Sequence, residues 1–416
     1  MAISDFYKTK SLKVTEVSGQ PTISRTVCLK ITSGDDATTG TGEIVLDWSN
    51  IGSKADIGVY DESNNLLDYY FESFDATAET AVIWVFRDWV RDGTVQAKIA
   101  YGNGPSDQSV VASTVFSKES DLERGYLFNE DSGGLLDVSG NNNDGTVYGA
   151  TRGETGMVDG AYSFDGSDDY VDTTNITSSD YSFVCWIKAP AHVGYIFCND
   201  DGMFELACGS PRWGDCAQDR IELGTRYSNG NANTLHTDNA VVDDSWIHAV
   251  GLMLEGETAD NFEIYINGGK AATSTGRSQG TGSLNDGLLT IGYRSGFGDY
   301  LNGIVAHATI HSSILSPDDI LALYDATKSS PALFDQEAAS GFATISGTVN
   351  LSGSGVENAK LFLMNDSTGK LEATTTTDAD GNYSFDAISG DTYHVAVQYG
   401  DGSQKYNDYS KPYLVP

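Results

Sequence analysis

The sequence predicts an all-β protein made of three β-sandwich modules in tandem. The chain of 416 residues is long enough for about three modules of the usual size, about 100–200 residues each. It contains 46 Gly and 22 Tyr, a composition typical of short strands joined by turns. Segments that alternate apolar and polar residues recur between turns rich in Gly, Asp and Asn. This pattern indicates half-buried antiparallel strands.

The first predicted module covers residues 1–118. Its alternating segments include VCLKIT, GEIVLDW, AVIWVFRDW and TVQAKIAYG. The succession of Asp56-Ile57, Trp84-Val85 and Tyr101-Gly102-Asn103 resembles a small domain of unknown function that precedes laminin-G-like modules in archaeal and bacterial surface proteins. The resemblance implies a sandwich and no particular chemistry.

The second predicted module covers residues 119–330 and ends with a helix. Ser316 is expected to cap this helix, with Pro317 at its first position and Asp319 completing a capping box. The segments GAYSFDGSDDYVDT, YSFVCWIKA and YLNGIVAHATIH resemble, in this order, the laminin-G and pentraxin-like jelly rolls. The resemblance implies a central concanavalin-like jelly roll with one short helix near its end.

Residues 331–341 are small and polar and predict a linker, and residues 342–416 predict a third sandwich with a C-terminal tail. A Thr-rich strand followed by Asp378, Asp380 and Gly381 resembles the transthyretin-like, carboxypeptidase-regulatory-like domains. That resemblance implies a spacer or a self-association unit. The last stretch, QKYNDYSKPYLVP, is similar to short tails of phage tail-associated proteins.

The charge of the chain indicates its environment. The formal net charge is -35, and the acidic residues are dispersed among the turns, as on the solvated surface of a folded chain. In about 1 M salt the Debye length falls to about 3 Å, which screens the self-repulsion of such a surface. A halophilic source follows, with an acidic marine or bacterial surface protein as the alternative. Nucleic acid is excluded as a partner because no basic patch exists.

Membrane insertion and secretion signals are not expected. No apolar run approaches the ~20 residues of a membrane span, and the first residues lack the apolar core of a signal peptide. Modules of an extracellular type without an export signal are typical of virion proteins, which lysis delivers to the outside.

The motifs predict a protein without enzymatic activity. There is no Glu-x-Asp-x-x-Glu triplet of the kind glycosidases use, no GxSxG elbow and no HExxH site. Glu43 and Asp47 share a strand face but lie in the first module. His248, two residues after Trp246, is predicted to be a packed, hydrogen-bonded core histidine.

One turn has the composition of a calcium site. Asp137, Asn141, Asn143 and Asp144 offer hard oxygen ligands at short spacing, which calcium prefers. The laminin-G resemblance implies a further Asp ligand, but this chain has Ala306 at that position. An Asn/Asp turn without an ion is the alternative.

Three cysteines lie close together in a Gly- and Asp-rich stretch. Cys198, Cys208 and Cys216 leave a local disulfide between two of them open, against free thiols. Zinc is disfavoured because the stretch has no CxxC pair.

The segment from Tyr195 to His236 is predicted to be an irregular binding loop held by the rigid sandwich. It combines an aromatic side chain with planar polar groups, which suits a glycan. A long surface loop and a subunit contact are the alternatives. The candidate ligand-binding residues are Trp213, Asp215, Arg220, Arg226, Asn229 and Asn231.

Together these features predict a virion structural and adhesion protein of a tailed virus of halophilic archaea, similar to tail fibres, spikes or capsid turrets and located on the virion surface. Its expected partners are other capsid or tail proteins, host surface glycans or glycoprotein, and further copies of the chain. Two alternatives stay open: a cellular surface adhesin or lectin of a halophilic archaeon, and an accessory carbohydrate-binding protein.

Overall fold

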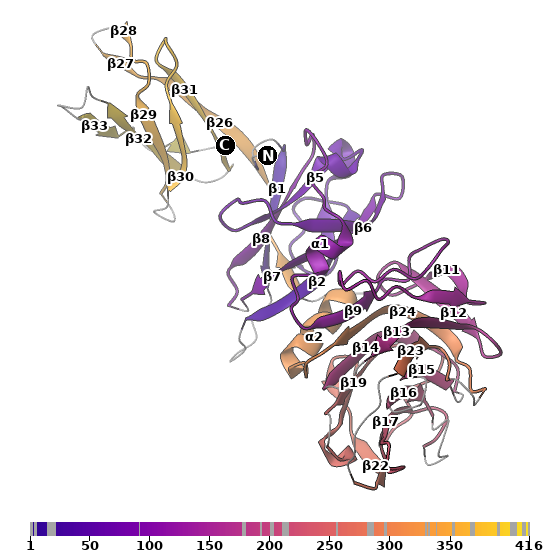
Figure 1. Cartoon of the computed structure of the whole chain (residues 1–416). Helices are drawn as coiled ribbons and strands as arrows, with labels where there is room; N and C mark the ends of the chain where they lie inside the picture. The colour runs from indigo at the N-terminus through magenta and orange to yellow at the C-terminus, as the bar shows by residue number, and fades with distance from the viewer. Residues whose placement is uncertain are drawn as a thin grey trace.

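A computed structural model of the chain shows an almost entirely β-stranded protein, which confirms the predicted fold class (Figure 1). Its only α-helices in the described part are α1 (Ala112–Phe116) and α2 (Pro317–Thr327). Neither has the length and apolar composition needed to cross a bilayer. The structure describes Ile3 and residues 6–14, 22–90, 92–176, 180–191, 194–199, 204–209, 216–254, 257–280, 287–294, 298–328, 331, 333–337, 339–351, 354–366, 371–388, 392–399, 406–409 and 413–414.

Two sheets form the N-terminal module. The first is four-stranded, in the order β4 (Ile44–Leu46), β2 (Ile23–Ser33), β7 (Thr80–Trp89) and β6 (Tyr69–Asp75). The second contains β5 (Ile57–Asp61), β8 (Val95–Tyr101), β1 (Lys8–Val14), β25 (Phe334–Gln336), β3 (Gly40–Thr41), β26 (Ser340–Thr348) and β31 (Asn382–Ile388). Alternating apolar residues of both sheets, such as Leu12, Val27, Val85 and Ile99, fill the space between them.

The segment 331–341, predicted to be a linker, is instead part of the N-terminal module. Strand β25 pairs antiparallel with β1, with Lys13 opposite Asp335. The first residues of strand β26 also pair antiparallel with β1, with Ser340 opposite Thr9. Leu333 and Phe334 lie in the N-terminal core. The small polar residues of the segment suggested a linker. However, Leu333 and Phe334 complete a core that is formed mainly by residues some three hundred positions earlier in the chain. The central module is therefore inserted into the N-terminal one.

The central module is a sandwich of two eight-stranded sheets. One sheet, which packs toward the N-terminal module, contains β11 (Thr151–Thr155), β12 (Gly160–Asp165), β24 (Asn302–His311), β14 (Tyr181–Lys188), β19 (Trp246–Met253), β20 (Glu263–Ile266), β21 (Gly269–Lys270) and β9 (Leu122–Tyr126). The other, here called the β10–β22 sheet, contains β10 (Thr146–Tyr148), β13 (Tyr170–Ile176), β23 (Gly287–Ile291), β15 (Gly194–Asn199), β16 (Phe204–Cys208), β17 (Ile221–Arg226), β18 (Ala232–Thr237) and β22 (Thr273–Ser278).

Helix α2 forms where the sequence predicts it and joins two modules. The hydroxyl of Ser316 accepts a hydrogen bond from the backbone N–H of Asp319 at 3.1 Å, and the capping box is complete. Ile320 and Leu323 pack on the central module, whereas Ala322 packs in the N-terminal core. The helix therefore lies between the two modules, as Figure 1 shows.

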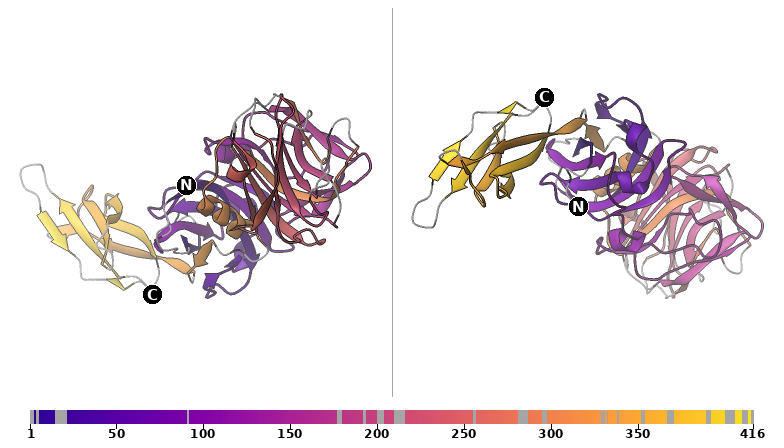
Figure 2. Two further views of the ribbon diagram at one scale, coloured as in Figure 1. Left: turned by 90° about the horizontal axis from the view of Figure 1, so that it is seen from below. Right: turned by 90° about the horizontal axis from the view of Figure 1, so that it is seen from above.

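The C-terminal module is a smaller sandwich that extends away from the central one (Figure 2). Its main sheet contains β30 (Leu371–Thr376), β29 (Lys360–Asn365), β32 (Thr392–Tyr399), β33 (Tyr406–Tyr409) and β34 (Tyr413–Leu414). A hairpin of β27 (Asn350–Leu351) and β28 (Ser354–Gly355) stands beside it. Strand β26 pairs with β31 over Phe342–Thr348 and so connects this module to the N-terminal one.

Candidate functional site

The predicted binding segment is more regular than the sequence suggested. Its described residues form strands β15 to β18 of the β10–β22 sheet instead of an irregular loop. Apolar residues that alternate along these strands, such as Phe197, Leu206 and Leu223, face the core. Trp213 and Asp215 lie outside the described residues.

The other four predicted ligand-binding residues do not converge. Arg220 donates a hydrogen bond to the carbonyl of Thr237 at 3.3 Å, at one end of the β17–β18 hairpin. Asn229 accepts a hydrogen bond from the backbone N–H of Asn231 at 2.9 Å, in the turn at the other end. Arg226 is the last residue of β17, next to that turn. The two ends are separated by the length of a six-residue strand, about 20 Å, so these side chains form no single site.

The outer face of the β10–β22 sheet, the face turned away from the core, carries charged side chains at its centre. Neighbours of Glu205 and Glu222 along their strands point into the core, so the alternation places both carboxylates on the outer face. A Cβ on Gly224, opposite Glu205, would lie 2.9 Å from its Oε1, so the glutamate extends across this glycine. Glu205 is 2% exposed and Glu222 is 0% exposed. Both carboxylates are therefore out of reach of a substrate.

At the β10 edge, the same sheet carries a cluster of four tyrosines, here called the tyrosine row: Tyr148, Tyr170, Tyr293 and Tyr300. Tyr148 and Tyr170 are directly opposite each other in the β10–β13 pairing, and their rings are stacked at 4.5 Å and 15°. Tyr293 follows β23 and Tyr300 precedes β24, and these two rings are also stacked at 4.5 Å and 15°. Tyr170 joins the pairs, with its centroid 5.1 Å from that of Tyr293.

No direct signal in the sequence predicts the tyrosine row. Its members are spread over more than 150 positions, in segments whose pairing is set by the topology of the whole module. The one local cue is that Tyr148 and Tyr170 lie on the outward side of alternating strands, Tyr148 exposed and Tyr170 partly exposed.

The predicted calcium ligands hold a turn together by hydrogen bonds. Both carboxylate oxygens of Asp137 accept backbone N–H groups: Oδ1 from Gly125 and Ser139, at 3.0 and 2.9 Å, and Oδ2 from Asn143, at 2.9 Å. The amide groups of Asn141 and Asn143 donate to backbone carbonyls, and Asp144 accepts from the N–H of Asp137. The alternative of an Asn/Asp turn without an ion therefore fits these contacts better than a calcium site.

A direct test follows from these bonds. Replacing Asp137 by alanine is expected to lower the free energy of unfolding by about 1–3 kcal/mol, because three buried backbone donors lose their acceptor. Adding a chelator to the native chain is expected to leave its melting temperature unchanged. The exposed neighbour Asp131, replaced by alanine, is the matched control. A fall in melting temperature on chelation, absent in the Asp137 variant, would restore calcium to this turn.

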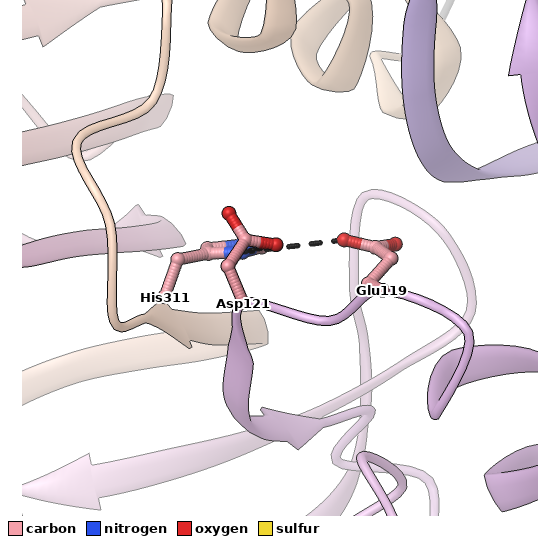
Figure 3. A group of neighbouring side chains, drawn as sticks. All are labelled: Glu119, Asp121 and His311. Carbon is pink, nitrogen blue, oxygen red and sulfur yellow. Dashed lines mark ion pairs between the residues drawn. The ribbon is translucent and has the colours of Figure 1, made fainter.

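Two other groups of side chains have the spacing of metal ligands. Glu119, Asp121 and His311 converge where the N-terminal and central modules meet, as Figure 3 shows. The guanidinium of Arg25 already supplies the positive charge that a metal ion would bring to these carboxylates. It contacts Asp121 at 2.6 Å and 3.0 Å and Glu119 at 3.3 Å. Burial would raise the pKa of Asp121, but the hydrogen bonds of His311 and Arg25 bring this pKa well below its usual range.

The second group, Asp165, Asp168 and Asp169, forms an acidic turn. Asp165 accepts the backbone N–H of Ser167 at 2.8 Å, and Asp169 accepts that of Asp165 at 3.0 Å. Burial, and then the charges of Asp165 and Asp168, raise the pKa of Asp169. These contacts stabilise the turn that leads into β13.

The side chains considered for catalysis have structural roles. Asp47 forms an ion pair with Lys8 at 2.9 Å and caps a short 3-10 turn. His248 is packed between the rings of Trp186 and Tyr324, and burial lowers its pKa to about 3. Its packing agrees with the prediction, but its ring nitrogens have no hydrogen-bond partner among the described residues.

The local disulfide that the sequence left open is not formed. None of the five cysteines, all of them among the described residues, is joined to another by a disulfide. Cys208 points into the core of the central module, whereas Cys198 lies with Tyr195 and Ala207 on the outer face, so the first two candidates are on opposite sides of the sheet. Burial raises the pKa of the Cys208 thiol to about 12.

The chain is a protein of several β-sandwich modules, and family models match parts of these modules. Residues 165–321 match the concanavalin A-like lectin/glucanases superfamily, residues 344–408 match the carboxypeptidase regulatory-like domain, and residues 53–140 match a domain of unknown function, DUF2341. These are the three domain types that the sequence resembles. The third match extends beyond residue 118 and ends within the Asp137 turn.

Solved structures with a related arrangement are distant. Domain 4 of AbnA, an extracellular arabinanase from Geobacillus stearothermophilus, is 20% identical with a TM-score of 0.39, over 49% of this chain and 98% of that one. The botulinum neurotoxin serotype D binding domain is 15% identical with a TM-score of 0.39, over 69% of this chain and 74% of that one. No curated protein matches the chain. Likenesses at this level carry no argument about ligands.

Proposed function

We propose that the protein is a non-enzymatic adhesion protein that binds glycans on the outer face of the β10–β22 sheet. The observation that carries the proposal is that the centre and the edge of this face differ in exposure. Its two central carboxylates, Glu205 and Glu222, are buried, whereas its β10 edge presents the partly exposed tyrosine row. A glycosidase needs two carboxyl groups in contact with the sugar, but a lectin needs an aromatic surface and hydrogen-bonding groups. The match of this module to the concanavalin A-like lectin/glucanases superfamily supports a carbohydrate ligand.

The test is adsorption of the purified full chain to cells or isolated surface glycoprotein of the host, with and without enzymatic removal of glycans. Adsorption is expected before deglycosylation and is expected to disappear after it. The double variant Glu205→Gln, Glu222→Gln separates binding from hydrolysis, because a glycosidase would lose release of reducing sugar. Release of sugar by the native chain but not by this variant would contradict a purely binding role, and adsorption that survives deglycosylation would contradict glycan binding.

The setting that best suits such a protein is the particle of a tailed virus infecting halophilic archaea, as a tail fibre, spike or capsid turret. The net charge of -35 and the tandem adhesion-type modules support this setting. A cellular surface adhesin of a halophilic archaeon is the second candidate, favoured by the same features. Antibodies against the chain would label purified particles in the first case and intact uninfected cells in the second. A homo-oligomer is expected in both.

The halophilic setting predicts a melting temperature that rises with salt. Between 0.1 M and 2 M KCl the Debye length falls from about 10 Å to less than about 3 Å, so repulsion among the surface carboxylates is largely screened. Thermal unfolding followed by circular dichroism measures the change. Sucrose at equal osmolality is the control, because it stabilises proteins by exclusion without screening charge. A melting temperature that rises equally in sucrose, or stays flat in KCl, would remove the argument from charge.

A further inference from the structure

We infer that the tyrosine row binds an uncharged glycan, with one sugar ring stacked on Tyr148 and neighbouring hydroxyls held by the other tyrosines, and that its surroundings reject anionic sugars. This inference rests on the proposed function and names the site and the ligand class within it.

The row is a fixed surface. Tyr148 and Tyr170 are locked opposite each other by the β10–β13 ladder, and Tyr293 and Tyr300 flank β23 and β24 of the same module. Successive ring centroids are 4.5, 5.1 and 4.5 Å apart. Rings packed in this way have lost their rotamer freedom before a ligand arrives, which reduces the entropy cost of binding.

Tyr148 supplies the stacking surface. One face of its ring rests on Tyr170, and strand β10 is the edge of the sheet, so no further strand covers the other side. The residue is 42% exposed, an unusual value for a ring that is already stacked. An exposed ring face at the rim of a rigid surface suits the flat apolar face of a pyranose, which gains both apolar burial and van der Waals contact.

The remaining tyrosines supply hydrogen bonds. Burial raises the pKa of Tyr170 and of Tyr300, and the charge of Asp172 adds to the effect at Tyr170. A tyrosine phenol is protonated at neutral pH even at its ordinary pKa, and the upward shift acts in the same direction, so these groups can both donate and accept. A sugar hydroxyl also donates and accepts, so the row and the ring edge of a glycan are complementary.

The charge around the row determines the class of glycan. The exposed Asp168 and the partly exposed Asp172 and Asp299 lie beside the tyrosines in the chain. The nearest arginine in the chain, Arg294, is 2% exposed, and its charge acts on the buried phenol of Tyr195 and on the carboxylate of Asp299. The field at the row is negative, so uronate, sialate or sulfate groups would be repelled, whereas neutral sugars would not.

A cross-strand aromatic ladder can also serve only to stabilise a sheet edge, with each pair contributing about 0.2–1 kcal/mol. The two roles predict different results for Tyr148, the most exposed member of the row. A purely structural tyrosine would change stability and leave glycan affinity untouched.

The experiment measures binding of the full chain to matched panels of neutral, amino and acidic oligosaccharides, by glycan array and then by calorimetry, in 0.1 M and 2 M KCl. Neutral glycans are expected to bind at both salt concentrations, and acidic ones only weakly at 0.1 M. Tyr148→Ala is expected to weaken binding about tenfold or more, because it removes the stacking surface. Tyr148→Phe, which keeps the ring, is expected to stay within about threefold of the native Kd.

Tyr7→Ala is the matched control, since Tyr7 is also an exposed tyrosine but lies in the N-terminal module. It is expected to leave affinity unchanged, and the melting temperature of every variant is measured alongside. If the native chain binds acidic glycans best at low salt, or if Tyr148→Ala binds as tightly as the native chain, the inference is wrong while the proposed function stands. If the native chain binds no glycan, the proposed function itself fails.

Discussion

Replacement of Arg25 by alanine is expected to lower the free energy of unfolding by about 3–5 kcal/mol, because it leaves one buried and two partly buried carboxylates without their cation. The side chain of Arg25 is 9% exposed and reaches Glu119, Asp121 and Asp319, which come from the connection between the modules and from helix α2. Glu119 also accepts a hydrogen bond from the backbone N–H of Thr26 at 2.5 Å, so its carboxylate cannot move into solvent without breaking this bond as well. Chemical denaturation of the full chain measures the change.

The pH dependence of this loss has a definite sign. The pKa of Asp121 is lower in the folded chain than in the unfolded chain. The contribution of Asp121 to stability is therefore fully present at pH values above the ordinary pKa of an aspartate. It is lost as the pH falls through the lower pKa of the folded state. The difference between the native chain and the Arg25 variant is therefore expected to be largest near neutral pH and to shrink in acid. Lys118→Ala is the control, because the Lys118–Asp68 pair is exposed and such pairs contribute about 0–1 kcal/mol. Equal losses in the two variants would show that Arg25 does not hold the modules together.

The local features of the fold could be predicted from the sequence because they depend on near neighbours. The capping box of Ser316 and Asp319 forms as expected, and Asn267 and Gly268 take the positive φ angles, 52° and 80°, that a tight hairpin turn requires. The alternation in YSFVCWIKA likewise produces strand β14. In each case the residues that decide the structure are within a few positions of one another.

The features that failed depend on contacts distant in the chain. Nothing in the composition of segment 331–341 shows that Leu333 and Phe334 belong to a core made by residues 12–101. The composition of the segment from Tyr195 to His236 suggested an irregular binding loop, but its described residues form strands β15 to β18, whose pairing depends on the whole sheet. The calcium site at the Asp137 turn stays a prediction, and the sequence could not show that one backbone donor to Asp137 comes from Gly125, twelve positions earlier.

Phe334→Ala, made in the full chain, is expected to lower the free energy of unfolding by about 3–5 kcal/mol, although it lies in a segment with the composition of a linker. The ring of Phe334 is 5% exposed and packs edge-on against the indole of Trp89 at 5.1 Å. Loss of this ring would open a cavity between β25 and β7 that the rigid sheets cannot close. Because Trp89 is the contact and is one of six tryptophans, the change in intrinsic fluorescence is read together with the melting temperature.

Asp335→Ala is the matched control, because Asp335 is on the same strand with its side chain exposed. The free energy of unfolding of this variant is expected to stay within about 0.5 kcal/mol of the native value, as for other surface positions.

A chain that ends at residue 331 tests the whole segment. It lacks Leu333 and all of β25, and it also lacks Gln336, whose Oε1 accepts a hydrogen bond from the buried ammonium of Lys10 at 3.1 Å. The loss of two large core side chains is comparable to the whole stability of a domain, about 5–15 kcal/mol. The N-terminal module of that chain is therefore expected to unfold, whereas a chain ending at residue 341 is expected to melt cooperatively. If both truncated chains keep the native fluorescence of Trp89, segment 331–341 is a linker after all, and the central module follows the N-terminal one instead of being inserted into it.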